Sequence, residues 1–336
     1  MTRKVRFHET GPPEVLRLDQ VEVLYPAKGE VRIRTRALGL NRADALFRAG
    51  RYAYDPVLPS GIGYEAAGEV DAVGPDVAHL AVGDAVSVVP AFAMTDYGVH
   101  GELVLAPAHA VVKHPATLSW EQAAAAWMQY VTAYGGLIEL ARLREGDTVL
   151  LPAASSSVGL GAIQVARMVG AVPVALTRTS DKRDRLLEAG AAEVIATQED
   201  DVVARVRELT GGEGARVAFD AVGGPGIADL ASSAAPGGII VNYGGLDPRD
   251  ISLPSSDVVG KHLTLVGYNI FETTQDAARR RAAVDFILDG LARGLLNPAI
   301  DRTFTLDQIV DAHRHLESGD QVGKIVITVA QPENIP

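Results

Sequence analysis

Short runs in which apolar and polar residues alternate fill the first 120 residues, together with many Gly and Pro residues. The clearest runs are Glu30–Arg36, Ala67–Gly74 and Asp84–Val89. A period of two residues, with turn residues between the runs, is typical of half-buried antiparallel strands. The pattern therefore predicts a mostly antiparallel β domain over this part of the chain.

The pattern changes at Ser119, which precedes an Ala-rich stretch and is a suitable N-cap for a helix that continues toward Tyr134. Apolar strands and helices then alternate, and the segment from about Thr274 predicts two helices and a last strand from Lys324. Alternating strands and helices predict an α/β fold with a doubly wound parallel sheet. We expect its six strands at Val149–Leu151, Val172–Leu176, Glu193–Ile195, Val217–Asp220, Ile239–Tyr243 and Leu263–Gly267.

The turn after the first of these strands consists of very small residues, from Ala153 to Ser157, and an amphipathic helix follows from Val158. Small side chains allow a pyrophosphate to approach the backbone, and a helix N-terminus offers unpaired N–H groups. Ser155, Ser156 and Ser157 stand where such turns usually carry glycines. A serine-rich turn is also an ordinary N-cap, so the turn alone leaves both interpretations open.

The end of the second strand bears on the choice of cofactor, because dinucleotide folds bind the adenosine ribose there. An acid at this point binds a free 2′-hydroxyl, whereas basic and hydroxyl residues suit a 2′-phosphate. This strand ends without an acid, and Asp181 is expected to cap the next helix. The basic and hydroxyl residues favour NADPH over NADH, although they also fit the solvated first turn of a helix; they are Thr177, Arg178, Thr179, Lys182 and Arg183.

Length and composition fit an enzyme of two domains. The chain has 336 residues, enough for a sizeable core, and no apolar run reaches the length of a membrane span. The N-terminus lacks the apolar core of a signal peptide, so we expect a cytoplasmic protein without a membrane partner. The net charge of −11, with no long basic tract, argues against a nucleic-acid partner.

The chain contains no cysteine, which excludes disulfides, thiolate metal sites and a cysteine nucleophile. Among the eight histidines only His313 and His315 lie close in sequence. Two residues apart on a helix, they point to different faces. We therefore expect no metal site.

Nearly the whole chain carries a series of short motifs in a fixed order. The most specific are Arg48–Tyr52 and Leu58–Gly68, and the others are Gly11–Leu16, Gly39–Asp44, Asp71–Gly74, Val82–Asp84, Ala154–Gly159, Asp220–Gly223 and Gly323–Val326. In these motifs the chain resembles the medium-chain dehydrogenase/reductase superfamily, and within it the zinc-free quinone oxidoreductases. The resemblance implies a GroES-like catalytic domain from residues 1–122 and 267–336, and a Rossmann dinucleotide-binding domain from residues 123–266.

The resemblance also bears on zinc. Zinc-bearing relatives place a cysteine at the position of Asn41, a histidine at that of Tyr64 and a cysteine near Met128, and this chain retains none of them. A mechanism in which a metal polarises the substrate oxygen therefore lacks its ligands. Hydride transfer would then depend on orientation and hydrogen bonds.

Site residues are carried over from the resemblance position by position. Asn41 and Thr132 are expected near the nicotinamide half of the cofactor. The pyrophosphate is expected at Ser156, Ser157 and Val158, and the 2′-phosphate at Thr179 and Lys182. Loops at the carboxyl ends of the strands should add further contacts, from Val222, Tyr243, Gly244 and Tyr268.

A tyrosine hydroxyl is the best candidate for contact with the substrate, because it can donate a proton or orient a carbonyl oxygen. The candidates are Tyr52, Tyr54, Tyr64 and Tyr97. Tyr52 matches an active-site position of the family, Tyr64 replaces a metal ligand, and together with Asn41 they form the expected catalytic set. Each tyrosine can equally be a packing residue, and a reduced quinone can take its proton from water.

The resulting hypothesis is an NADPH-dependent, zinc-independent reductase that transfers hydride to a small hydrophobic acceptor, either a quinone or an activated alkene. The alternatives are an enoyl or enone reductase, a zinc-free carbonyl reductase, and a protein that binds NADPH without turnover. The last strand of the parallel sheet, His262–Gly267, carries few charges, and an apolar sheet edge invites pairing with another chain. We therefore expect a homodimer joined through this edge, as in relatives.

Overall fold

The computed structural model describes residues 1–330, so the end of the expected 267–336 segment, residues 331–336, lies outside the described part. The chain forms two compact units, Met1–Met128 with Pro298–Pro336, and Gln129–Asn297. This division assigns α9 (Phe271–Thr274) and α10 (Ala277–Ala292) to the second unit rather than to the β domain. The expected boundaries at residues 122 and 267 stay predictions.

The first unit is built around a mixed seven-stranded sheet. Its order is β15-β16-β3-β5-β6-β8, with β7 paired to β3, and only β15 and β16 run parallel. The strands are β3 (Glu30–Gly39), β5 (Glu65–Val73), β6 (Ala85–Val88), β7 (Leu103–Pro107), β8 (Val111–Lys113), β15 (Ile300–Thr305) and β16 (Lys324–Thr328). A small antiparallel sheet of order β2-β1-β4 is formed by β1 (Thr2–Phe7), β2 (Leu16–Val21) and β4 (Ser60–Gly61).

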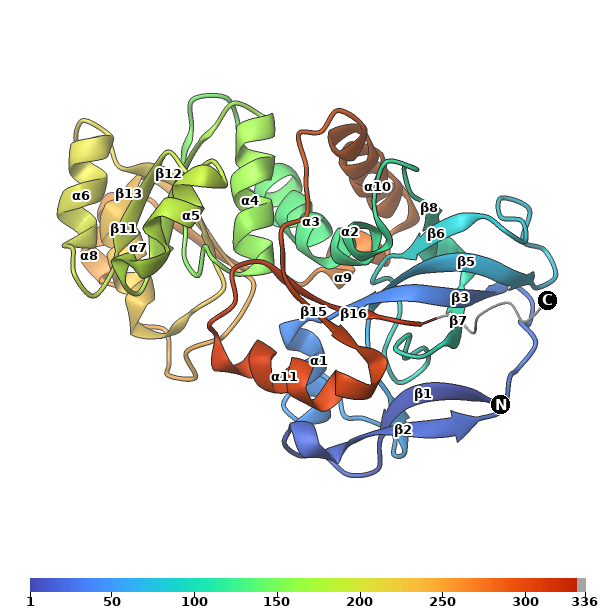
Figure 1. Ribbon diagram of the computed structural model, residues 1–336. Coiled ribbons are helices and arrows are strands. Elements are labelled where there is room, and N and C mark those ends of the chain that lie inside the picture. Colours follow the sequence, from blue (N-terminus) through green and yellow to red (C-terminus); the bar gives the residue numbers. More distant parts are fainter. Residues whose placement is uncertain (331–336) are drawn as a thin grey trace. The chain divides into compact units, whose positions relative to one another are not determined.

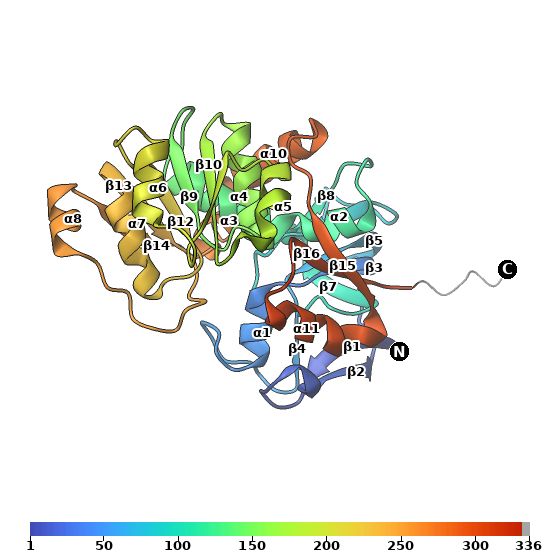
Figure 2. The ribbon, with the colours of Figure 1, turned by 60° about the vertical axis from the view of Figure 1, so that its left-hand side comes forward.

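The first unit also contains α1 (Arg42–Arg48), α2 (Trp120–Ala125) and α11 (Ile309–Ser318), which are labelled in Figure 2. Ser119 is the N-cap of α2 and accepts a hydrogen bond from the Gln122 N–H at 3.2 Å, as the sequence predicts. The alanine face of α2 packs on Ala37, Ala67 and Val326 of the sheet. This approach is so close that a Cβ on Gly39 would lie 2.2 Å from the Ala124 carbonyl oxygen.

The second unit, coloured from green to orange in Figure 1, contains the predicted doubly wound parallel sheet. Its strand order is β11-β10-β9-β12-β13-β14. All neighbouring pairs are parallel. Each predicted strand is present, within a few residues of its expected ends: β9 (Thr148–Leu151), β10 (Val172–Thr177), β11 (Glu193–Ala196), β12 (Ala215–Asp220), β13 (Ala234–Asn242) and β14 (Thr264–Gly267).

Helices connect these strands by crossovers, which are right-handed in parallel sheets. They are α4 (Ser157–Met168), α5 (Arg183–Glu188), α6 (Val202–Leu209), α7 (Ile227–Ser233) and α8 (Ser255–Gly260). Apolar residues of α6 and α7, such as Val206 and Ile227, form one buried cluster with Leu150, Val174 and Ile240 of the strands. Because sheet order reverses between β9 and β12, the carboxyl ends of these two strands are the expected ligand site of this fold.

Two local expectations are wrong. The helix expected to run from Ser119 toward Tyr134 is divided, because α2 ends at Ala125, α3 covers Trp127–Ala133, and a π-helix follows at Tyr134–Leu140. No strand was expected in the C-terminal segment before residue 324, but the structure has β15 there. Among residues 1–330, no helix combines the length and the apolar composition that a membrane crossing requires.

Candidate functional site

The turn after β9 has the geometry of a phosphate-binding turn, although serines replace its usual glycines. Ala153 adopts a φ of 52°, in the left-handed region that glycine adopts more readily. Ser156 is the N-cap of α4, and its Oγ accepts a hydrogen bond from the Gly159 N–H at 3.0 Å. The N–H groups of Ser157 and Val158 begin this helix, where no carbonyl of the helix can accept them. The cap therefore does not use the N–H groups of Ser157 and Val158.

Gly159 is the one position of the turn that requires glycine for space. A Cβ at this residue would lie 2.5 Å from the Ala154 carbonyl oxygen and 2.6 Å from its Cα. The first turn of α4 thus packs directly on the backbone of the loop. This close packing holds the start of the helix at the end of β9, where a phosphate group would lie in this fold.

The expected 2′-phosphate residues follow β10 and reach back toward the turn. Lys182 Nζ lies 3.4 Å from Ser155 Oγ, which places an ammonium group beside the phosphate turn. Thr179 Oγ1 donates to Asp181 Oδ2 at 2.9 Å, and Thr179 is the N-cap position of the short helix Ser180–Lys182. The expectation that Asp181 caps the next helix is therefore wrong, because its carboxylate binds the Thr179 hydroxyl instead.

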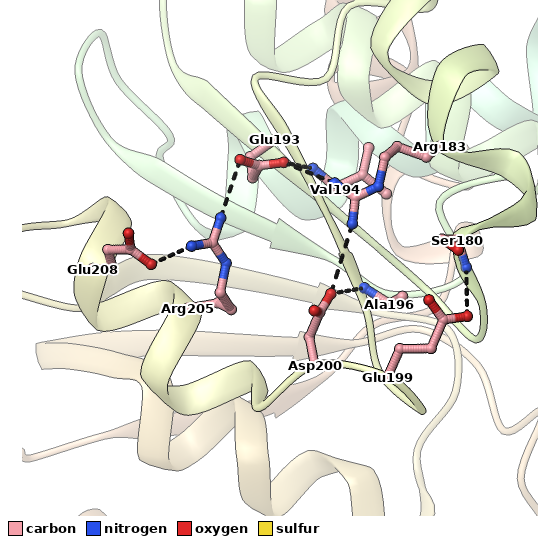
Figure 3. Close-up of polar contacts among 9 residues, drawn as sticks. All are labelled: Ser180, Arg183, Glu193, Val194, Ala196, Glu199, Asp200, Arg205 and Glu208. Atoms are coloured by element: carbon pink, nitrogen blue, oxygen red, sulfur yellow. Dashed lines mark hydrogen bonds and ion pairs between the residues drawn. The ribbon is translucent and has the colours of Figure 1, made fainter.

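Arg183 takes part in a separate group of ion pairs, shown in Figure 3. Its guanidinium lies 3.2 Å from Glu193 and 3.7 Å from Asp200. Glu193 and Asp200 thus neutralise the charge of Arg183. Arg205 also binds Glu193, at 3.4 Å. For Arg178 the described residues provide no hydrogen bond or ion pair to its guanidinium. Of the three basic residues, Arg178 and Lys182 are the ones that remain suited to a 2′-phosphate.

The loops after β12 and β13 are held by one buried carboxylate, Asp220. Its oxygens accept hydrogen bonds from the N–H groups of Val222 and Gly223, each at 2.8 Å, and from Asn242 Nδ2 at 3.0 Å. Asn242 Nδ2 also donates to the Gly244 carbonyl at 3.0 Å. Asp220 and Asn242 were not predicted, yet they fix the backbone of Val222 and Gly244, which were.

Tyr243 stacks on Phe219, with ring centroids 4.1 Å apart and an interplanar angle of 22°. Its hydroxyl is buried and has no hydrogen-bond partner among residues 1–330. Burial raises the pKa of this hydroxyl well above its ordinary value, with a smaller contribution from Asp220. A buried phenol without a partner is costly, and a polar group of a bound ligand would relieve that cost.

Thr132 and Tyr268, the other expected contacts in this unit, are both buried. Tyr268 Oη lies 3.1 Å from Thr273 Oγ1, which donates to Glu139 at 2.7 Å. Arg279 binds the same Glu139 carboxylate at 3.2 Å. The sequence did not indicate this network, which fixes the ring of Tyr268 through residues of α9 and α10.

The first unit holds a buried polar network around Glu65, which the sequence analysis quoted in a motif but did not select as a site residue. Glu65 Oε1 accepts hydrogen bonds from the N–H groups of Trp127 and Met128, both at 2.8 Å. Glu65 Oε2 accepts from Asn41 Nδ2 at 2.9 Å and pairs with the ammonium of Lys324. Lys324 also donates to Asn41 Oδ1 at 2.6 Å, so both ends of this amide are occupied.

The side chain of Asn41 therefore binds the Glu65–Lys324 pair, and its expected place near the nicotinamide stays a prediction. Glu65 and Lys324 are fully enclosed by the protein. Removing one member of a buried ion pair leaves an uncompensated charge and typically costs about 3–5 kcal/mol. The missed signal was the lysine of the Gly323–Val326 motif, which the sequence places far from its partner.

Several titratable groups surround this pair. Asp44 is fully buried, accepts from the Asn41 N–H at 2.8 Å, and burial raises its pKa to about 8. Arg48 donates to His313 Nδ1 at 3.1 Å and also pairs with Glu317. Burial lowers the pKa of His100 to about 4 and lowers that of His313 well below its ordinary value. The two histidines are therefore neutral near neutral pH.

A cluster of aromatic rings lies next to these groups. Tyr52 and Tyr54 pack on the buried Phe47 and meet each other edge to face at a centroid distance of 5.1 Å, and Tyr64 packs on Tyr52. The hydroxyl of Tyr64 is in hydrogen-bond contact with Tyr54 and lies 3.4 Å from that of Tyr52. Tyr97 is directed elsewhere, because its hydroxyl donates to Glu30 at 2.7 Å. Tyr52 and Tyr64 thus come together, with Tyr54 as a third member.

No group of three or more His, Asp or Glu side chains within residues 1–330 is arranged to hold a metal ion. Asn41, at a position expected to carry a ligand in zinc-bearing relatives, accepts a hydrogen bond from the Lys324 ammonium and donates one to Glu65. The hydroxyl of Tyr64, at another such position, contacts those of Tyr52 and Tyr54. At Asn41 the carboxylate of Glu65 is already paired with the ammonium of Lys324.

Family models match both units of the chain. An alcohol dehydrogenase GroES-like domain matches residues 27–116, and a zinc-binding dehydrogenase domain matches residues 157–289. The first lies on the mixed sheet of the first unit, and the second covers α4 and most of the parallel sheet that follows it.

Individual proteins match over almost the full length. Human quinone oxidoreductase is 30% identical over 329 residues, which cover 97% of this chain and 98% of that protein. Quinone oxidoreductase of Pseudomonas aeruginosa is 32% identical over 336 residues, covering 97% and 99%. The structure of Escherichia coli quinone oxidoreductase complexed with NADPH superimposes with a TM-score of 0.87 at 29% identity, covering 97% and 99%.

Proposed function

This chain belongs to the quinone oxidoreductase family, and from that premise we propose that it is an NADPH-dependent reductase that transfers hydride to a quinone or an activated alkene without a metal ion. The carrying observation is the phosphate turn together with Lys182, whose ammonium lies 3.4 Å from Ser155 of that turn. The reaction joins NADPH, a proton and the acceptor, and yields NADP⁺ and the acceptor reduced by two electrons.

NADPH is supported by the charges at the end of β10. Of the nearby acids, the Asp181 carboxylate accepts from the Thr179 hydroxyl, and the Glu199 carboxylate accepts from the Ser180 N–H. Arg178 and Lys182 can bind the extra phosphate of NADPH by charge-assisted hydrogen bonds. We infer that the pyrophosphate binds at Ser156, Ser157 and Val158, and that the loops of Val222, Tyr243 and Gly244 contact the nicotinamide half. When bound, NADPH supplies the hydride and the protein supplies position.

Independence from zinc is supported by the network around Glu65. Glu65 already pairs with Lys324, and a divalent cation placed beside this ammonium would be repelled. In a cysteine-free chain, the polarising group for the substrate oxygen must then be a hydrogen-bond donor. Tyr52 and Tyr54 are both partly exposed, but the Tyr54 hydroxyl already contacts the Met94 N–H and the Tyr64 hydroxyl, so we propose that Tyr52 donates to the acceptor.

A homodimer through β14 is also part of the proposal. This strand is the last of the sheet and pairs with β13 alone among the described strands. Leu265 on the strand is 40% exposed and Val259 on the preceding helix is 72% exposed, so the edge presents apolar surface. An unpaired apolar edge is a site for strand pairing, and a two-fold axis would pair β14 with its own copy.

The deciding experiment is NADPH oxidation measured with the purified chain over a panel of quinones, enones, acyl thioesters and aldehydes, with NADH as the comparison cofactor. We expect turnover with quinones or enones, a clear preference for NADPH, and rates that a chelator leaves unchanged. Preferential turnover of acyl thioesters would identify an enoyl reductase instead. Tight NADPH binding without turnover of any acceptor would identify a binding protein, and zinc-restored activity would overturn the metal-free mechanism.

A further inference from the structure

The three hydroxyls of the tyrosine cluster form a hydrogen-bonded chain whose direction is set by the bond from Tyr64 to Tyr52. The chain starts at the Met94 N–H, which donates to Tyr54 Oη at 2.9 Å. The Tyr54 hydroxyl contacts that of Tyr64, and the Tyr64 hydroxyl donates to Tyr52 Oη at 3.4 Å. We refer to the Met94 N–H and these three hydroxyls as the tyrosine chain.

Counting protons gives the direction. A phenol has one proton to donate, and that of Tyr64 is used toward Tyr52. The bond between Tyr54 and Tyr64 must therefore use the Tyr54 proton, and Tyr54 accepts from the Met94 N–H, which can only donate. Tyr52 is left as the last member, with its own proton unassigned. No described residue provides an acceptor for it, and Tyr52 is only partly buried.

Ring packing holds this direction in place. Phe47 is fully buried and packs edge to face on two tyrosine rings. The centroid of its ring lies 6.3 Å from that of Tyr52 and 5.5 Å from that of Tyr54. On the other side, Tyr64 packs on Phe92 at 5.8 Å. The rings therefore leave each hydroxyl little freedom to leave the chain, and the last donor has a defined position.

All three phenols keep their protons near neutral pH. Burial raises the pKa of Tyr52 to about 12 and also raises those of Tyr54 and Tyr64. A phenol that accepts a hydrogen bond from another phenol is polarised and becomes a better donor. The group that Tyr52 selects is consequently an acceptor rather than a donor.

We propose that Tyr54 is a positioning residue that acts through Tyr64 and makes Tyr52 a hydrogen-bond donor to an electron-rich oxygen. The site therefore selects carbonyl and phenolate ligands over ligands that can only donate hydrogen bonds. The inference rests on the proposed function, in which hydride addition to a quinone leaves the electron pair on a ring oxygen. Tyr52 stabilises that oxygen anion by its hydrogen bond and keeps its own O–H bond, while water supplies the proton of the hydroquinone.

The test measures binding of para-nitrophenol, whose anion absorbs visible light, to the full-length protein with and without NADPH. We expect binding to lower the apparent pKa of this phenol in the unaltered protein, because the site prefers the anion. Tyr52→Phe should weaken binding of the anion about tenfold, and Tyr54→Phe about threefold, as for the loss or misdirection of one hydrogen bond. Tyr25→Phe, the same change at an exposed tyrosine, is the matched control and should have no effect.

The double variant Tyr52→Phe/Tyr54→Phe separates positioning from general loss of structure. If Tyr54 acts through Tyr52, Tyr54→Phe has no further effect once Tyr52 is a phenylalanine. Equal anion binding in Tyr54→Phe and the unaltered protein, or additive effects in the double variant, would overturn the proposal. If anion binding depends on Tyr54 but the protein turns over no quinone, the proposed function is rejected. The role of Tyr54 in positioning Tyr52 would still be supported.

Discussion

Replacing Asp44 by asparagine should change how the stability of the protein depends on pH. Asp44 is fully buried in α1, where Oδ2 accepts from the Asn41 N–H at 2.8 Å and Oδ1 has no partner among residues 1–330. Burial raises the pKa of this carboxyl to about 8, against the opposing effects of the Asn41 N–H and Lys324. Asp44→Asn keeps the shape and an acceptor oxygen but removes the proton equilibrium.

The sign follows from the two states of the chain. An unfolded Asp titrates near its ordinary pKa of about 3.9, so between about pH 4 and pH 8 the folded protein holds a proton that the unfolded chain has released. Stability therefore falls as the pH rises through this window, by up to about 1.4 kcal/mol per pH unit. From about pH 6 to about pH 7.5 the loss amounts to about 2 kcal/mol, and Asp44→Asn should escape it.

Urea unfolding of both proteins at the two pH values measures this difference. His100 and His313 have lowered pKa values and add a slope of opposite sign, but they do so in both proteins and cancel in the comparison. Glu22→Gln removes an acid that is exposed and serves as the control, with a pH dependence like that of the unaltered protein. Parallel pH dependences for Asp44→Asn and the unaltered protein would refute the reasoning.

Three further variants address the cofactor, the turn and the edge strand. Lys182→Ala should weaken NADPH binding by about 1.5–3 kcal/mol and NADH binding far less, as measured by titration calorimetry; equal losses for the two cofactors would contradict a 2′-phosphate contact. Ala153→Gly should raise the free energy of unfolding by about 0.5–1 kcal/mol, because it removes left-handed strain at a φ of 52°, and a clear destabilisation would show that the strain is absent. Leu265→Lys should shift the protein from dimer to monomer in sedimentation without loss of folding, since a charge blunts an open sheet edge; a dimer of unchanged strength would place the interface elsewhere.

The six strands of the parallel sheet were predictable because each contains a short apolar run between turn residues, and β9, β11 and β12 are buried over most of their length. β15 was not predictable, because the run Ile300–Thr305 has no apolar pattern. It lies at the edge of its sheet, and each of its residues is partly or fully exposed. The break between α2 and α3 was also hidden, because Ala125 and Ala126 are good helix formers. There the bonds that Glu65 accepts from the Trp127 and Met128 N–H groups determine the backbone.

The candidate site, like the fold, was only partly predictable from the sequence. Residues selected by local sequence, such as Ser156 and Lys182, lie at the turn and strand end where the motif placed them. The polar partners that hold the site come from distant segments: Lys324 reaches Asn41 across 283 positions and Glu65 across 259. One sequence gives no measure of such pairings. Asp44 could not be recognised either, because its raised pKa depends on burial that only the packed unit creates.

The proposed phosphate turn keeps two of the features that glycines usually give such a turn. Glycines in such turns serve three purposes, which are a left-handed backbone, close approach of a phosphate, and close packing of helix on strand. Here Ala153 takes the left-handed position, and Gly159 retains the packing role, since its Cβ would lie 2.5 Å from the Ala154 oxygen. Ser156 adds an N-cap without using the N–H groups of Ser157 and Val158. The serine substitutions thus stabilise the start of α4 and leave its anion-binding groups available.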